Sequence, residues 1–130
     1  MAVDLYWDSP EQTTLICEID AGWTWDELEL ALRTAAQLAE DGDVGVIIAI
    51  GARAGFPEGA LAASGLRRGR QMLRLVETIP GPRIIAGDGL IAQLAAGWAQ
   101  QRPARAGLGC VPTLAQARAA LANGVSQPAL

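Results

Sequence analysis

Apolar residues in this chain follow two different spacings, and the alternation between these spacings predicts its elements. Residues 3–8 and 13–20 have the extended character of two strands, and the turn-forming segment 9–12 between them is of hairpin length. The second strand has one fully apolar face and one mixed face, formed by Leu15, Cys17 and Ile19 and by Thr14, Ile16 and Glu18. We therefore expect this strand near an edge of the sheet.

The clearest local signal is the start of the first helix, predicted over residues 25–40. Thr24 stands three residues before Glu27, the spacing of a capping box in which the hydroxyl accepts from the Glu27 N–H and the carboxylate reaches back. Trp23 and Leu28 occupy the hydrophobic-staple positions around this cap. One apolar stripe follows at helical spacing and should lie flat on the sheet: Leu28, Leu32, Ala35, Ala36 and Ala39.

Residues 44–51 form a β-branched run without polar alternation, which indicates a central parallel strand covered on both faces. The next helix is predicted from Pro57, a residue accepted at the first helical position, to about Thr78. It contains Gly65 and Gly69 one turn apart, each costing up to ~1 kcal/mol relative to alanine. Such bare positions indicate either close approach to a neighbouring element or a surface kept clear for a ligand.

The rest of the chain repeats the order of strand and helix. Residues 83–87 and 104–111 are predicted short strands, and each is followed by an apolar helical stripe. The two stripes consist of Ile91, Leu94, Ala95 and Trp98, and of Leu114, Ala117 and Leu121. Thr113 with Gln116 predicts a capped start of the last helix, and residues 123–124 predict its end.

The resulting order is β-β-α-β-α-β-α-β-α, which predicts an α/β fold with a five-stranded mixed sheet and four helices. Short connections favour right-handed parallel crossovers, so only the first strand should be antiparallel and the strands should lie in sequential order. A chain of 130 residues is expected to form one domain, over residues 1–124, with a flexible tail at 125–130.

Both this order and the residues that open the first helix, Gly22, Trp23, Thr24, Trp25 and Glu27, carry a family resemblance. The chain resembles the STAS superfamily, whose members are like the sporulation anti-sigma-factor antagonists, and is most similar to small uncharacterised bacterial STAS or Sec14-like proteins. The resemblance covers essentially the whole length. It implies sequentially ordered strands with helices packed on them, and binding of a protein or small ligand rather than catalysis.

The chain departs from the STAS pattern where classical members are regulated. Those members carry an aspartate at the end of the third strand and an Asp-Ser-Ser-Gly segment at the opening of the second helix, where a partner kinase phosphorylates a serine. Here Ala49 and Ile50 end the strand, and Pro57 and Glu58 open the helix. Regulation by a kinase is therefore not expected, and Ser64 is interpreted as a small helix-packing residue. The alternative is that Glu58 imitates a permanently charged state.

Composition and charge exclude several classes of function. A net charge of −4 and a pI near 4.7 argue against non-specific nucleic-acid binding, which needs a basic surface. The longest apolar run is about half of a bilayer span, and the amino terminus lacks an export pattern, so we expect a cytoplasmic protein without membrane insertion. The chain contains no histidine and no metal-ligand spacing, so no catalytic relay, metal or cofactor is expected.

The two cysteines, Cys17 and Cys110, lie far apart, and neither has a neighbouring cysteine or histidine. We expect both to be small buried apolar residues, because nothing in the sequence indicates export to an oxidising compartment. A disulfide and a reactive thiol are the alternatives.

The candidate binding residues gather on the second predicted helix, where four of the ten basic residues of this acidic chain lie: Arg67, Arg68, Arg70 and Arg74. Arg67, Arg70 and Arg74 share a face, because positions three and four apart are neighbours. This is either a solvated face or a surface that recognises an anion or docks a partner, since guanidinium groups bind carboxylate and phosphate bidentately. Phe56, just before the helix, and Glu58, at its opening, complete the predicted binding site.

Two weaker features have alternative interpretations. Residues 87–89, Gly-Asp-Gly, lie between a strand and a helix, where α/β sheets bind anions; otherwise they form a tight turn capped by Asp88. The residues Tyr6, Trp7, Phe56 and Pro57 either border an apolar opening for a ligand or belong to the core.

We therefore expect a non-enzymatic STAS-like module that binds a protein partner through the face of the second helix and adjacent loops. If helices cover only one face of the sheet, the other face needs a cover, and a second copy of the chain in a homodimer is the simplest one. The alternative function is a carrier or sensor that encloses a small apolar or anionic ligand between the second helix and the sheet.

Overall fold

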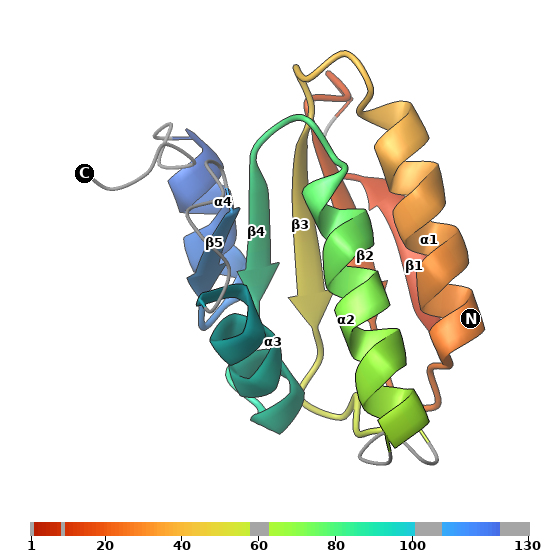
Figure 1. Ribbon diagram of the computed structural model, residues 1–130. Coiled ribbons are helices and arrows are strands. Elements are labelled where there is room, and N and C mark those ends of the chain that lie inside the picture. Colours follow the sequence, from red (N-terminus) through yellow and green to blue (C-terminus); the bar gives the residue numbers. More distant parts are fainter. Residues whose placement is uncertain (1, 9, 58–62, 101–107, 123–130) are drawn as a thin grey trace.

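The computed structural model describes residues 2–8, 10–57, 63–100 and 108–122 (Figure 1). Its elements follow the predicted order: β1 (Val3–Trp7), β2 (Thr14–Ile19), α1 (Trp25–Leu38), β3 (Gly45–Ile50), α2 (Ala63–Glu77), β4 (Arg83–Ala86), α3 (Leu90–Gln100), β5 (Leu108–Val111) and α4 (Leu114–Ala122). The predicted tail, the first part of the last predicted strand and Glu58 lie outside the described residues.

The strands form one mixed sheet in the sequential order β1-β2-β3-β4-β5 (Figure 1). β1 pairs with β2 in antiparallel fashion, from Val3 opposite Ile19 to Trp7 opposite Leu15, and every later pair is parallel. The hairpin explains the antiparallel pair, and a helix between successive later strands returns the chain to the same end of the sheet. The predicted α/β layout is therefore confirmed for the described residues.

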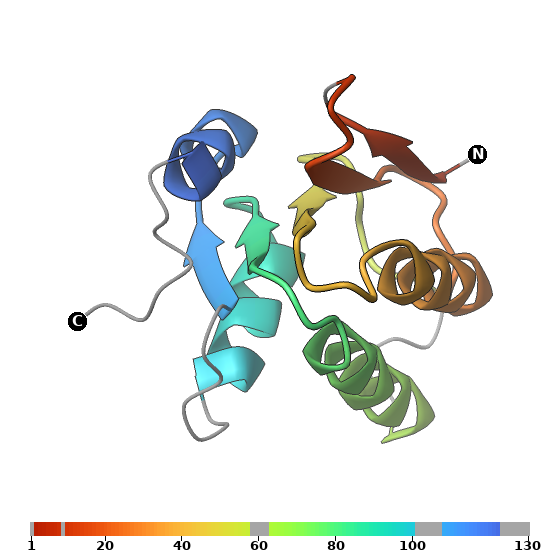
Figure 2. The same cartoon turned by 90° about the horizontal axis from the view of Figure 1, so that it is seen from above.

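The helices divide between the two faces of the sheet (Figure 2). α1, α2 and α3 cover the face that carries Leu15, Cys17 and Ile19, while α4 covers the opposite face with Ala117 against Ile16 and Ile47. Ile16 and Ile47 are 0% exposed. A homodimer was predicted only if helices covered one face of the sheet. This condition is not met, because the last helix of the same chain covers the second face.

α4 is fixed at its start and along its length. The Gln116 N–H donates to the Thr113 hydroxyl at 3.1 Å, which confirms the predicted cap. Arg118 donates two hydrogen bonds, of 2.9 and 2.8 Å, to the Asp8 carboxylate at the end of β1. This bidentate ion pair joins α4 to the loop between β1 and β2, at the edge of the sheet opposite β5.

Two predicted helix bounds differ from the structure. α1 ends at Leu38 with Ala39 as its C-cap, and Gly42, with a left-handed φ of 80°, donates its N–H to the Ala39 carbonyl at 3.0 Å. Pro57 lies in the loop after β3 and not in the helix, and the described part of α2 begins at Ala63.

Candidate functional site

The start of α1 places two tryptophans at the edge of the core. Thr24 is the N-cap and accepts from the Glu27 N–H at 3.2 Å, while its own hydroxyl donates to the Glu27 carboxylate at 3.3 Å. Trp23 and Trp25 flank this cap and meet edge to face, with ring centroids 4.9 Å apart and planes at 81°. The predicted N-cap at Thr24 is thus confirmed, but the Glu27 carboxylate accepts from the Thr24 hydroxyl and not from the Thr24 N–H.

The loop after β3 is held by one of these tryptophans. The Trp23 indole N–H donates to the Gly55 carbonyl at 2.7 Å, and Gly55 adopts a left-handed φ of 55°. The next residue, Phe56, is 38% exposed and reaches the same region. Because the loop uses the only polar group of the indole, Trp23 presents purely apolar ring surface to the interior.

The α2 backbone lies closest to α1 and α3, and its buried side chains Met72, Leu73 and Val76 border a space between α2 and the sheet. Gly65 and Gly69 are both buried, and Gly69 faces this space. The close contact between α1 and α2 fits the interpretation of these glycines as packing positions, and the place of Gly69 in the lining of this space leaves the ligand-surface alternative open.

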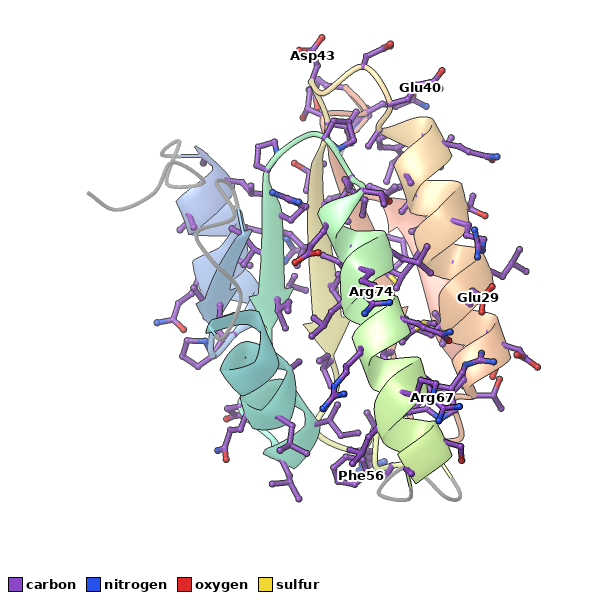
Figure 3. The ribbon with its side chains drawn as sticks, viewed as in Figure 1. Glu29, Glu40, Asp43, Phe56, Arg67 and Arg74 are labelled. Carbon is purple, nitrogen blue, oxygen red and sulfur yellow. The ribbon has the colours of Figure 1, made fainter. Side chains whose placement is uncertain are left out.

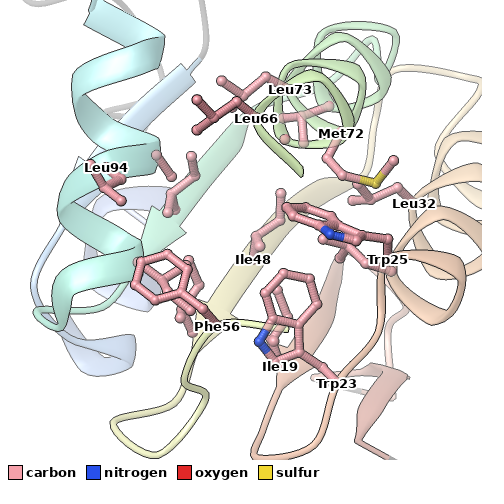
Figure 4. Close-up of a pocket in the computed structure, with 17 residues that line it drawn as sticks. Ile19, Trp23, Trp25, Leu32, Ile48, Phe56, Leu66, Met72, Leu73 and Leu94 are labelled. Carbon is pink, nitrogen blue, oxygen red and sulfur yellow. The ribbon is translucent and has the colours of Figure 1, made fainter. Parts of the chain in front are cut away.

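An apolar cavity of about 80 Å³ occupies this space and is partly open to solvent (Figure 4). Its walls come from α1, α2, α3, the loop after β3 and the inner face of the sheet, and include Trp23, Trp25, Phe56, Leu66, Met72 and Leu94. No charged side chain lines it. A cavity of this kind offers water few hydrogen-bond partners, so an apolar occupant is favoured over ordered water.

The opening of the cavity lies between α2 and α3. Most lining residues at the sheet and at α1, such as Ile48 and Leu32, are buried, although Trp25 and Ile50 are partly exposed. On the side of α2 and α3, Phe56, Leu66, Ile91 and Leu94 are partly or fully exposed. We call the gap bordered by these last four residues the cavity mouth. Figure 4 shows Leu66 and Leu94 facing each other across it.

The structure separates the four predicted arginines into two groups. Arg68 turns toward α1 and forms ion pairs with Asp26 at 3.0 Å and Glu29 at 3.4 Å. Arg67, Arg70 and Arg74 are exposed, and Arg67 and Arg74 project from the outer side of α2 (Figure 3). Within the described ranges these three form no ion pair. Arg68 therefore stabilises the contact between helices, and the other three remain available for binding.

The predicted apolar opening is confirmed for Phe56 only. Tyr6 lies on the opposite face of the sheet, where its hydroxyl donates to Glu18 at 3.1 Å, and its pKa is raised by burial and by that carboxylate. Trp7 packs against the main core without lining the cavity. Residues of one predicted cluster are separated because successive strand positions point to opposite faces.

The two cysteines have different surroundings. Cys17 is 0% exposed, and burial raises the pKa of its thiol to about 12, as expected of an apolar core residue. Cys110 is exposed on the edge strand β5, so its predicted burial is wrong. Both thiols are free, so the disulfide alternative does not apply.

The turn at 87–89 is unsuited to an anion. Asp88 lies one position before Gly89, whose carbonyl accepts the first helical bond of α3, so Asp88 is not the predicted cap. Beside it, at the carboxyl ends of the strands, is a crevice of about 410 Å³ whose lining includes Glu18, Asp20 and Asp88. Three carboxylates repel an anionic ligand, which removes the anion-binding interpretation of this turn.

Sequence reasoning missed Arg83, a buried arginine only 6% exposed at the start of β4. Its guanidinium donates to the carbonyls of Glu77 at 3.1 Å and Val76 at 3.4 Å, the last turn of α2. A cation at this position satisfies the unpaired carbonyls at the end of a helix. The signal in the sequence was an arginine at the start of an otherwise apolar strand, which indicates a buried cation with hydrogen-bond partners.

Among the described residues, no group of three or more potential ligands that could hold a metal ion is found, and no helix is long and apolar enough to cross a membrane. Comparison of the chain with protein-family models, with curated proteins and with solved structures gives no match.

Proposed function

We propose that this protein is a non-enzymatic binding domain, a carrier or sensor that encloses the apolar part of a small ligand between α2 and the sheet. The observation that carries the proposal is the apolar cavity of about 80 Å³, which borders α1, α2, α3 and the sheet together. A void in the core removes packing contacts and so lowers stability. Its occupation by a ligand would restore those contacts.

The expected affinity follows from the number of carbon groups that the cavity can remove from water. Transfer of roughly four carbon groups from water into an apolar site is worth about 3 kcal/mol at ~0.8 kcal/mol per group. This corresponds to a dissociation constant in the millimolar range for a simple hydrocarbon chain. A natural ligand that binds more tightly needs further contacts outside the cavity.

The experiment uses 1-hexanol as probe and a matched pair of glycine variants. Gly69→Leu places a side chain in the cavity, whereas Gly97→Leu on α3 adds the same side chain where no atom lies within 4 Å. We expect the first variant to lose hexanol binding and the second to retain it. Equal hexanol binding by both variants contradicts the proposal, and Gly69→Ala provides a milder test if Gly69→Leu does not fold.

The proposed function includes membership of a STAS-like group. It is supported by the sequential strand order with an antiparallel first strand, and by the cap at Thr24 between two tryptophans, features that the resemblance implies. Native mass spectrometry of freshly purified protein separates a carrier, which retains a small molecule, from a protein-interaction module, which is bare.

A second candidate function is docking of an acidic protein partner on the outer face of α2. It is favoured by Arg67, Arg70 and Arg74, which are exposed and form no ion pair with any described residue. Replacing Arg67 and Arg70 with glutamate should abolish partner binding, because the reversed charges repel a carboxylate surface. Unchanged affinity for an isolated partner contradicts this candidate.

A further inference from the structure

Arg70 lies on the flank of α2 that borders the cavity mouth. Residues two positions apart are about 200° apart around a helix, so Arg70 and Arg68 project from opposite flanks. Arg68 contacts α1 through Asp26 and Glu29, which places Arg70 on the flank toward α3.

The neighbours of Arg70 on the helix surface confirm this placement. Leu66 precedes it by four residues and Leu73 follows it by three, spacings at which side chains are adjacent. Both leucines line the cavity, and Figure 4 shows them on the side of α2 that faces α3. The Arg70 side chain itself is exposed and does not line the cavity, so it lies in solvent beside these leucines.

No described acidic residue neutralises this arginine. It forms no ion pair within the described ranges, and α3, the element across the mouth, contains no charged residue from Leu90 to Gln100. Arg74, one turn further along α2, adds a second positive charge on the exposed side of the helix. The charged side chains of α2 beside the mouth are therefore positive, while the interior is apolar.

We infer that the ligand is a small amphipathic monoanion whose aliphatic chain enters the cavity while its carboxylate binds the Arg70 guanidinium at the mouth. This assignment rests on the proposed function and adds the chemical class of the ligand to it. A guanidinium fork matches a carboxylate in geometry as well as charge.

The cavity volume favours a narrow chain over a ring as the buried end. Its size of about 80 Å³ is roughly half of the ~150 Å³ of an engineered cavity that binds benzene. A narrow alkyl chain fits this shape, because it can fill the enclosed part and continue through the mouth. The expected class is therefore an alkanoate rather than an aromatic acid.

The test compares hexanoate with 1-hexanol, which share one chain length and differ in charge, by calorimetric titration at low ionic strength. Wild-type protein should bind hexanoate roughly fivefold more tightly, as expected for one exposed charge pair at its upper range. Arg70→Gln should reduce this ratio to about one and leave hexanol binding unchanged. Arg33→Gln, which removes the same charge on α1 away from the mouth, should keep the wild-type ratio.

Each outcome separates this inference from the proposed function. Binding of hexanol with no preference for hexanoate, or a preference that survives in Arg70→Gln, overturns the inference and leaves the cavity function standing. Binding of neither probe overturns the proposed function itself. Benzene binding as tight as hexanol binding overturns the assignment of an aliphatic ligand.

Discussion

Replacement of Trp23 with phenylalanine should release the loop that borders the cavity. The variant removes the 2.7 Å hydrogen bond from the indole N–H to the Gly55 carbonyl, a loss of about 0.5–1.5 kcal/mol. It also removes roughly three heavy atoms from a side chain that is only 5% exposed, worth about 2 kcal/mol at ~0.8 kcal/mol per carbon group. The free energy of unfolding should therefore fall by about 3 kcal/mol.

Trp25→Phe is the matched control for this variant. Trp25 loses the same ring atoms but is only partly buried, and no hydrogen bond from its indole to a described residue is found. We expect a loss of about 1 kcal/mol in the control. The difference between the two variants then reports the contact between Trp23 and the loop.

Urea denaturation followed by circular dichroism measures both free energies, and limited trypsin digestion measures the loop directly. Arg53 is exposed within that loop, between Gly51 and Gly55. Cleavage after Arg53, identified by mass, should accelerate in Trp23→Phe and remain slow in Trp25→Phe, because only the first variant frees the loop. Equal destabilisation of the two variants together with equal cleavage would refute this reasoning.

Three further predictions concern positions away from the cavity. Gly81→Ala should destabilise the protein by about 2–3 kcal/mol in urea denaturation, because the added Cβ collides with the Val44 carbonyl oxygen; unchanged stability would contradict this close approach. Burial raises the pKa of the Cys17 thiol from 9.0 to about 12. Between these two pH values the folded state therefore keeps a proton that the unfolded state loses. The free energy of unfolding should then fall by up to ~1.4 kcal/mol for each pH unit from 9.0 to about 12. A Cys17→Ala variant with the same alkaline slope would show that this thiol is not the cause. A double-mutant cycle with Arg118→Ala and Asp8→Ala should give a coupling of only about 0.5–1 kcal/mol that shrinks in high salt, because the Arg118 side chain is 48% exposed; a salt-independent coupling would contradict this.

The layout of the fold follows from local patterns. The apolar run at 44–51 predicted a strand covered on both faces, and β3 has α1, α2 and α3 on one side and α4 on the other. The mixed face of β2 was equally informative, since Ile16 alone of that face is fully buried, beneath α4. These predictions succeed because the spacing of apolar residues reports directly which sides of an element are buried.

The cavity was not predictable in size or wall composition. Periodicity shows which face of α2 is buried, but the distance between α2 and the sheet depends on how α2 packs against α1. Arg68 is the plainest case. It was counted among the candidate binding arginines because it lies on the same predicted helix, but it pairs with Asp26, 42 residues away in the chain, and with Glu29 on the same neighbouring helix. Contacts of this kind are not encoded in local spacing.

Two errors have a similar origin. Cys110 was expected in the core because cysteine is commonly buried, but it lies on β5, the last strand of the sheet, where its side chain is exposed. Asp88 was expected to cap α3, but the helix begins one residue later than that assignment requires. In both cases the prediction came from the residue type, whereas the outcome depended on where the strand or helix lies.

The most direct test of the account is a titration of methyl-labelled protein with 1-hexanol, followed by nuclear magnetic resonance. Met72 lines the cavity, whereas Leu121 belongs to α4, packs against the apolar cluster on the opposite face of the sheet and serves as an internal control. We expect the Met72 methyl resonance to shift in a saturable way while the Leu121 methyl resonances stay in place. A Met72 resonance that does not move, or equal shifts at both residues, would contradict ligand binding in this cavity.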